Sequence, residues 1–266
     1  MGPRYRTATA FVLVSLIAAC AGPDVDRAPT RPPDVSAVPD AVPRAEPRSA
    51  SGNPPFYEVN GRRYHVMNSS RGYRKRGVAS WYGQKFHGRR TSSGETYDMY
   101  SMTAAHKTLP LPAYARVTNL ANGQSVVVKI NDRGPFVDNR LIDLSYAAAN
   151  RLDMIRAGTA MVEVEVLDPT TPTLPARTAE ATQQTADGSM YIQAGAFRSK
   201  DNAESLARRV RAQASEDTRV FIRRDSVDGD TIYRVRIGPV AGVDQFDRLV
   251  EQMARIGISD AYLALD

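Results

Sequence analysis

Hydrophobic and polar residues alternate differently along the chain and divide it into two folded units. The first unit, residues 76–167, has short β-type runs at residues 77–82, 114–119, 125–130 and 161–166, separated by turn signals such as Asn122-Gly123. Only residues 145–152 read as a helix, with Ser145 as its N-cap. This pattern predicts a small, mostly β barrel.

The second unit, residues 188–266, has longer amphipathic segments. Strand patterns at residues 190–197, 219–223, 231–237 and 261–264 are interleaved with helical patterns at residues 199–210 and 245–256. The order β-α-β-β-α-β predicts an open antiparallel sheet with both helices on one face. The other face of the sheet is therefore expected to be free for binding.

The first nineteen residues have a pattern that is typical of an export signal. Arg4 and Arg6 precede an apolar run at residues 10–19, which is too short to span a bilayer of about 30 Å. The run ends in Ile17-Ala18-Ala19-Cys20, which resembles a bacterial lipobox and implies lipidation of Cys20. A plain signal peptide with a chance cysteine is the alternative. By resemblance to enterobacterial sorting, the alanine after Cys20 implies an outer membrane lipoprotein that faces the periplasm.

The positions of the prolines, the single cysteine and the net charge further limit the domain organisation and the possible ligands. Prolines cluster between residues 21 and 55, so we predict a lipidated, semi-extended tether over residues 20–75 and a second linker over residues 168–187. The single cysteine excludes an intramolecular disulfide and a zinc site built on cysteine pairs. The net charge of +6 is spread along the chain, so no nucleic-acid partner is predicted.

Three polar clusters in the first unit carry a family resemblance. They lie at residues 91–98 (TSSGETYD), 103–110 (TAAHKTLP) and 131–136 (NDRGPF). Together with residues 77–83 (GVASWYG) and 142–145 (IDLS), they resemble the six-stranded double-psi β-barrel of the rare lipoprotein A family. Residues 191–197 (YIQAGAF) and 233–239 (YRVRIGP) resemble the small α+β, RNP-like SPOR domain that often follows this barrel.

The resemblance implies a septal lytic transglycosylase that cleaves the MurNAc-β-1,4-GlcNAc bond and leaves a 1,6-anhydro-MurNAc end. Such chemistry needs an acid for the leaving oxygen and a base for the sugar's own 6-hydroxyl. Asp132 and Glu95 stand at the two catalytic-carboxylate positions of the family, and we expect Asp132 to be the acid/base and Glu95 to assist. His106 is expected to orient the pair or to contact sugar. The resemblance implies no metal and no cofactor.

Structural interpretations stand beside these catalytic ones. Glu95 on a glycine-containing loop is alternatively a solvated turn residue, and Asp132 a turn residue that pairs with Arg133. His106 fits a hydrogen-bonded structural histidine equally well. Core packing is the better interpretation of Trp81. Structural roles are also expected for a further set of acidic residues: Asp98, Asp138 and Asp143.

For the second unit the resemblance implies binding to denuded glycan, which lacks stem peptides and occurs at the division septum. Removing the peptide exposes a lactyl carboxylate that an arginine can bind. We expect Gln193 and Arg234 to bind the glycan, with Tyr233 as an aromatic contact. The family's binding positions correspond to Gln193 and Ala196, which strand alternation separates, so we expect a bulge at Gly195.

Two further functional classes stay open at this point. The barrel can be non-catalytic, which would make the chain a septal peptidoglycan-binding lipoprotein, or it can be a hydrolase that uses water. The second unit is alternatively an interaction module for a divisome protein. Because the Glu95 and Asp132 pair is present, the enzyme is favoured.

Overall fold

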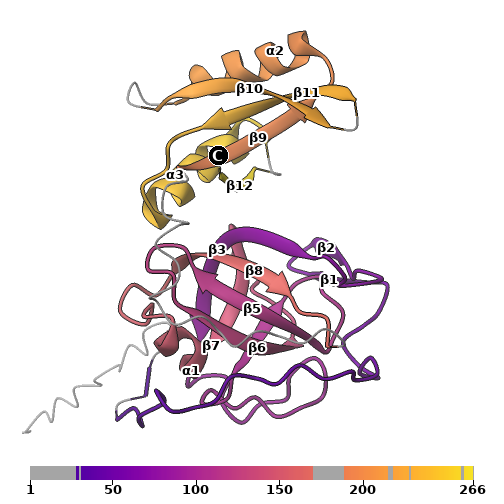
Figure 1. Cartoon of the computed structure of the whole chain (residues 1–266), viewed down its shortest axis with the longest axis vertical. Helices are drawn as coiled ribbons and strands as arrows, with labels where there is room; N and C mark the ends of the chain where they lie inside the picture. Colours follow the sequence, from indigo (N-terminus) through magenta and orange to yellow (C-terminus); the bar gives the residue numbers. More distant parts are fainter. Residues whose placement is uncertain are drawn as a thin grey trace, which may run out of the picture.

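A computed structural model describes residues 28–29, 31–169, 189–214, 218–227, 229–258 and 261–265. The predicted leader and the predicted lipidation site at Cys20 lie outside these residues, as does most of the predicted linker. Within the described part of the chain, no helix is both long enough and apolar enough to cross a membrane. The described residues form two lobes (Figure 1).

The first lobe is a closed six-stranded barrel with the strand order β3-β7-β4-β6-β5-β8. The β3–β7 and β4–β6 pairs are parallel and the other pairs are antiparallel. Its elements are β3 (Arg74–Tyr82), β4 (Thr103–His106), β5 (Ala113–Asn119), β6 (Ser125–Asp132), β7 (Arg140–Ser145), the helix α1 (Tyr146–Arg151) and β8 (Ala160–Val166). The predicted mostly β barrel is confirmed, and Ser145 caps α1 by accepting a hydrogen bond from the Ala148 backbone N–H.

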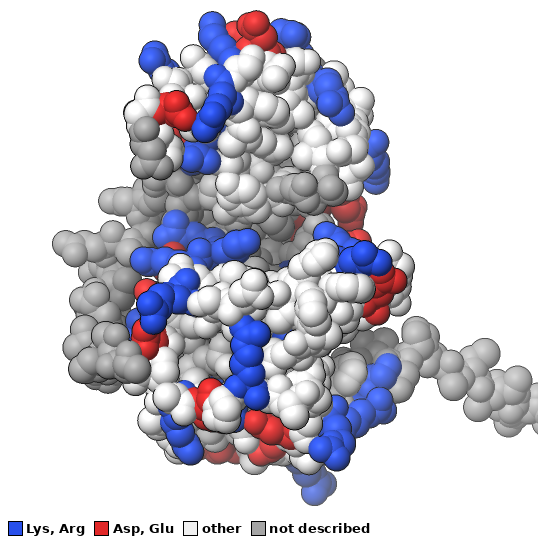
Figure 2. All heavy atoms as spheres, turned by 90° about the vertical axis from the view of Figure 1, so that its right-hand side faces the viewer, with Lys and Arg blue, Asp and Glu red and all other residues white. Residues whose placement is uncertain are grey.

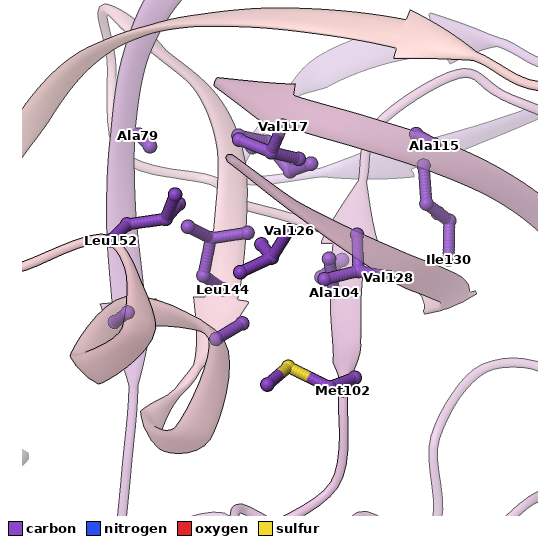
Figure 3. Packing of buried hydrophobic residues seen from close by; sticks show 14 of the residues in the cluster. Ala79, Met102, Ala104, Ala115, Val117, Val126, Val128, Ile130, Leu144 and Leu152 are labelled. Carbon is purple, nitrogen blue, oxygen red and sulfur yellow. The ribbon is translucent and has the colours of Figure 1, made fainter. Parts of the chain in front are cut away.

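Alternate side chains of β6 point into the barrel core, and the others point away from it. Val126, Val128 and Ile130 are fully buried in the core, where they pack near Leu144 (Figure 3). Burying side chains of this size contributes about 1.5–3 kcal/mol each. The intervening positions on β6 point the other way, and these include Lys129. The packing of the core thus fixes which β6 side chains are available to a site.

The segment before the barrel differs from the predicted tether. From Val35 onward the chain lies against the barrel and then forms a hairpin of β1 (Phe56–Val59) and β2 (Arg62–His65) (Figure 1). The Ala41 N–H donates to the carbonyl of Val127 on β6 (3.0 Å), and the Ser49 N–H donates to the carbonyl of Leu111 (3.0 Å). The prediction of a free tether is therefore wrong for this stretch, because backbone hydrogen bonds hold it to the barrel.

The second lobe is a four-stranded antiparallel sheet with the order β10-β11-β9-β12. Its elements are β9 (Met190–Phe197), α2 (Lys200–Arg211), β10 (Val220–Val227), β11 (Asp230–Ile237), α3 (Val243–Arg255) and β12 (Tyr262–Leu265). Both helices pack their apolar faces on one core with Ile192, Val235 and Leu263. The predicted β-α-β-β-α-β order and the helix-covered face are confirmed.

A β-bulge in β9 changes the alternation of its side chains. Val235 pairs with Gly195 but Arg236 pairs with Gln193, so Ala194 is the extra residue. Gly195 faces α2, since a Cβ placed there would lie 2.8 Å from Leu206. Ala196 is therefore exposed on the face opposite the helices, the same face as Gln193. A bulge is therefore present, with Ala194 as its extra residue in place of the expected Gly195.

The two lobes touch each other through a polar and an apolar contact. Arg140 of β7 binds both carboxylate oxygens of Asp247 of α3, at 2.8 and 2.9 Å. Val78 and Met161 of the barrel belong to the core of the second lobe. A hollow separates the lobes beside these contacts, and lysine and arginine side chains follow its lower edge (Figure 2).

Candidate active site

Glu95 lies on the loop between β3 and β4, where two β6 side chains hold its carboxylate. Lys129 and Asn131 are two residues apart and therefore point to the same side of the strand. The Lys129 Nζ is 2.8 Å from Oε1, and the Asn131 amide donates to Oε2 at 2.8 Å. The Glu95 side chain is 44% exposed, so it is fixed on one side and open to solvent on the other.

The Lys129 ammonium keeps its charge at this position. Burial lowers its pKa, but hydrogen bonds to Glu95 and Glu46 outweigh burial and leave the pKa above its usual value. A permanently charged lysine therefore stands behind the Glu95 carboxylate.

Asp132 ends β6 and is held by the loop that carries Glu95. Its Oδ1 accepts hydrogen bonds from the Ser92 N–H (2.8 Å), the Ser92 hydroxyl (2.7 Å) and the Arg133 N–H (2.7 Å). Among the residues that the structure describes, Oδ2 receives no hydrogen bond. Residues 91–95 thus bring both carboxylates to the end of β6, with Oδ2 of Asp132 left for a ligand.

Arg133 does not form the ion pair with Asp132 that the turn interpretation expects. Its guanidinium donates instead to carbonyl oxygens of Gly52, His106 and Leu109, at 2.6–3.0 Å, and to the side chain of Asn53 at 3.2 Å. Arg133 therefore fixes the backbone around Asp132 and leaves that carboxylate's charge without a paired guanidinium.

His106 lies behind this arrangement, buried to 3% exposure. Its Nδ1 accepts from the Thr108 and Leu109 N–H groups (3.2 and 3.0 Å), and its Nε2 is 2.8 Å from the hydroxyl of Tyr73. Both ring nitrogens are engaged away from the carboxylates, so the structural interpretation of His106 fits these contacts better than direct contact with sugar. Its link to the pair runs through its own carbonyl and Arg133.

We expect the buried imidazole to make stability depend on pH. Burial, with the charges of Lys107 and Arg133, lowers the pKa of His106 to about 3. In the unfolded chain a histidine titrates near 6.5, so between these values only the unfolded chain binds the proton. The free energy of unfolding therefore falls by about 1.4 kcal/mol per pH unit as pH drops through this window.

Urea denaturation between about pH 6 and pH 4 measures this slope. The free energy of unfolding should fall more steeply with decreasing pH in the wild-type chain than in His106→Asn. The difference in slope should correspond to the binding of one proton, about 1.4 kcal/mol per pH unit. Equal slopes would show that His106 is accessible to protons in the folded chain.

Other polar and aromatic residues keep the structural roles expected of them. Asp98 accepts a hydrogen bond from the Tyr100 N–H at 3.0 Å and so stabilises a turn. Asp138 is 84% exposed. Trp81 packs against the barrel core with its ring at 5.9 Å from that of Tyr146. None of these contacts places a further acid beside Glu95 or Asp132.

A hollow of about 680 Å³ lies beside Lys129, the residue that binds Glu95. Tyr100, Thr103, Tyr114 and Lys129 line it on the barrel side, and residues 38–46 line it on the other. Lys129 thus links the hollow to Glu95, with its ammonium 2.8 Å from that carboxylate. Its aromatic and charged lining suits a polar ring compound such as a sugar.

The second lobe offers a separate polar surface on its helix-free sheet face. Gln193 donates to the hydroxyl of Tyr262, and the Arg234 guanidinium lies 3.5 Å from the other amide atom of Gln193. Asp225 holds Arg234 in place at 2.7 Å. Gln193, which is only 3% exposed, and Arg234 thus lie side by side on this face.

The aromatic member of this surface is Tyr262 and not Tyr233. Tyr233 packs on the helix side with the apolar core, so its predicted contact with glycan is wrong. Tyr262 pairs with Gln193 across β9 and β12 and is half exposed. Alternation with the buried Leu263 is the signal in the sequence that would have identified it.

Tyr262 also borders the hollow between the lobes. This space of about 940 Å³ is lined by residues 261–263 of the second lobe and by Glu163 and residues 74–76 of the barrel. Residues 74–76 are Arg-Lys-Arg, and Figure 2 shows basic side chains along this edge. An anionic ligand on the sheet face of the second lobe would therefore lie near a basic edge of the first.

Each of the two lobes matches a known protein family. Residues 74–164 match the family model described as lytic transglycolase, and residues 186–264 match the SPOR domain model. The chain is thus a lytic transglycolase-type barrel joined to a SPOR domain.

Two relatives match over most of their length. The chain is 40% identical to the endolytic peptidoglycan transglycosylase RlpA of Pseudomonas aeruginosa strain UCBPP-PA14, over 85% of this chain and 80% of the relative. It is 39% identical to the protein of the same name from Vibrio cholerae, over 95% of this chain and 94% of the relative. The crystal structure of the RlpA SPOR domain from P. aeruginosa matches with 27% identity and a TM-score of 0.27, over 28% of this chain and 96% of that one. The chain belongs to the RlpA family of peptidoglycan transglycosylases.

Proposed function

We propose that the chain is a lytic transglycosylase that cleaves the MurNAc-β-1,4-GlcNAc bonds of peptidoglycan to 1,6-anhydro-MurNAc ends. The observation that carries the proposal is the pair of carboxylates, Asp132 and Glu95, fixed at the end of β6 by the loop at residues 91–95. Family membership supports the reaction class, and the hydrogen bonds that hold the two carboxylates support the roles proposed for them.

The proposed reaction begins with a proton on the Oδ2 of Asp132, the oxygen that the surrounding loop leaves open. Asp132 gives this proton to the glycosidic oxygen as the bond to MurNAc C1 breaks. The sugar's 6-hydroxyl then attacks C1 to form the C1–O6 bond, and Asp132 takes the hydroxyl proton. No water is consumed, and the acid returns to its starting state.

Glu95 assists by its charge in this proposal. The developing oxocarbenium ion is positive, and a carboxylate that Lys129 and Asn131 hold in place needs little reorganisation to stabilise it. The hollow beside Lys129 receives a neighbouring sugar of the strand. His106 stays a positioning residue that acts through its carbonyl on Arg133.

The SPOR domain directs the enzyme to glycan that lacks stem peptides. Arg234 binds the exposed lactyl carboxylate, Gln193 donates to the sugar, and Tyr262 stacks on it. Such glycan is enriched at the septum, where we place the protein, with divisome proteins as neighbours. We further propose that a lipid on Cys20 anchors the chain to the outer membrane, so that both domains face the periplasm.

Exchanging the exposed aromatic residue tests this assignment in the SPOR domain. We expect Tyr262→Ala to weaken pelleting with peptide-free sacculi by roughly tenfold, the loss of a stacking contact of about 1–1.5 kcal/mol. Turnover of short soluble glycan strands should be unchanged. Tyr233→Phe is the matched control, because Tyr233 packs with the apolar core on the helix side, and it should pellet like the wild type.

The reaction itself is tested by mass spectrometry of the soluble products from residues 21–266 incubated with peptide-free sacculi. Anhydro-MurNAc ends support the proposal. Reducing MurNAc ends would make the protein a hydrolase, and pelleting without release would make it a binding protein.

A further inference from the structure

Residues 41–53, which we call the strap, run along the barrel and contact residues that hold the two candidate catalytic carboxylates. The strap precedes the barrel domain, whose family model begins at residue 74. Ala41 hydrogen-bonds to Val127 at its start and Ser49 to Leu111 near its end, so both parts of the strap are fixed to the barrel. Figure 1 shows this indigo segment running along the barrel wall.

The first contact of the strap with the site is made by Glu46. Its Oε2 is 3.0 Å from the Nζ of Lys129, which is 2.8 Å from Glu95 on its other side. The Tyr114 hydroxyl donates to Oε1 of Glu46. This hydrogen bond lowers the pKa of Glu46 below its usual value, so at neutral pH the lysine lies between two carboxylates.

The second contact joins the end of the strap to Arg133. The guanidinium donates to the Gly52 carbonyl from Nε and Nη2, at 2.9 and 2.7 Å, and to Oδ1 of Asn53 at 3.2 Å. Asn53 is fixed in turn by the backbone of Leu111, which donates to Oδ1 (2.8 Å) and accepts from Nδ2 (2.7 Å). The backbone N–H of Arg133 donates to Oδ1 of Asp132.

Gly52 brings the strap against the loop that holds the same aspartate. A Cβ at this position would lie 2.6 Å from the Ser92 carbonyl oxygen, and its φ of +80° is in the left-handed region. Ser92 is the residue whose N–H and hydroxyl bind Asp132. The strap therefore contacts both groups of residues that fix this carboxylate.

We propose that the strap is part of the catalytic site, with Glu46 and Asn53 as positioning residues that act through Lys129 and Arg133. The inference rests on the proposed transglycosylase function. The strap contacts one residue that binds each catalytic carboxylate: Lys129, whose ammonium binds Glu95, and Arg133, whose backbone N–H binds Asp132. The catalytic unit accordingly begins near residue 41, and the barrel domain alone is incomplete.

Removal of the Asn53 side chain tests the Arg133 contact in the chain of residues 21–266. Asn53→Ala should lower kcat on peptide-free glycan roughly tenfold, because small displacements of a catalytic group cost this much or more, and should leave KM within about twofold. Asn68→Ala, an exposed asparagine outside the site, is the matched control and should turn over like the wild type.

A double-mutant cycle separates positioning from general loss of stability. In the Arg133→Lys background the guanidinium that Asn53 binds is absent, so Asn53→Ala should lower kcat by less than about twofold further. A variant that only destabilises the fold would lower activity by the same factor in both backgrounds. That additive result would overturn the inference.

Glu46→Gln tests the Lys129 contact by removing the charge while keeping the shape. We expect kcat to fall several-fold with KM unchanged, and Glu58→Gln, an exposed glutamate paired with Arg63, to have no effect. Wild-type kcat in both Asn53→Ala and Glu46→Gln, with an active wild type, would overturn the inference alone. An inactive wild type would overturn the proposed function, and this inference with it.

Discussion

Asp132→Asn is expected to lower the release of anhydro-MurNAc products by roughly 10²- to 10⁴-fold, the usual contribution of a positioned general acid/base. Asparagine keeps an oxygen that can accept from the Ser92 and Arg133 N–H groups, so the loop should stay in place. It cannot give or take the proton that the glycosidic oxygen and the 6-hydroxyl require. The loss should therefore appear in kcat.

Product release from peptide-free sacculi, followed by mass spectrometry over time, measures this effect. Pelleting of the same variant with sacculi should equal that of the wild type, because the SPOR surface is in the other lobe. Asp138→Asn is the matched control, an exposed aspartate outside the site that should keep full activity. Release by Asp132→Asn at the wild-type rate would remove Asp132 from the mechanism.

Glu95→Gln is expected to have the second largest effect, on the order of a 10²-fold fall in kcat. The amide can still accept from Lys129, but it brings no negative charge to the oxocarbenium ion. Lys129 would still pair with Glu46, but its charge would no longer be offset on the side of residue 95, so the loss combines a missing attraction with an added repulsion.

Initial rates on soluble glycan strands measure this loss without the contribution of the SPOR domain. Adding Lys129→Met to Glu95→Gln should recover part of the activity, since it removes the cation that repels the developing positive charge. If Glu95 is only a turn residue with no role in catalysis, Glu95→Gln will react at the wild-type rate, as Glu58→Gln is expected to do.

Much of the fold follows from the sequence because each lobe buries one face of periodic strands and helices. Four barrel strands have clear hydrophobic runs, whereas β4 and β7 are short and were visible only as motifs. The stretch from Val35 to the hairpin looked like a tether because its attachment uses backbone groups, and a backbone hydrogen bond leaves no pattern of side chains.

Part of the candidate site can be predicted from the sequence. Glu95 and Asp132 were placed by family resemblance, and the spacing of Lys129 and Asn131 on β6 would have indicated their shared face. The targets of Arg133 are mostly carbonyl oxygens from distant segments, which no local pattern shows. In the SPOR domain, family resemblance predicts an aromatic contact at Tyr233 and a basic one at Arg234, but adjacent strand residues point in opposite directions, so these two cannot share a face.

The most direct test of the central claim is the digestion of peptide-free glycan in water enriched in heavy oxygen. If the 6-hydroxyl attacks C1, the new MurNAc ends are anhydro sugars that carry no heavy oxygen. Reducing MurNAc ends that have incorporated one heavy oxygen per cleavage would contradict the account, because water would then be the nucleophile.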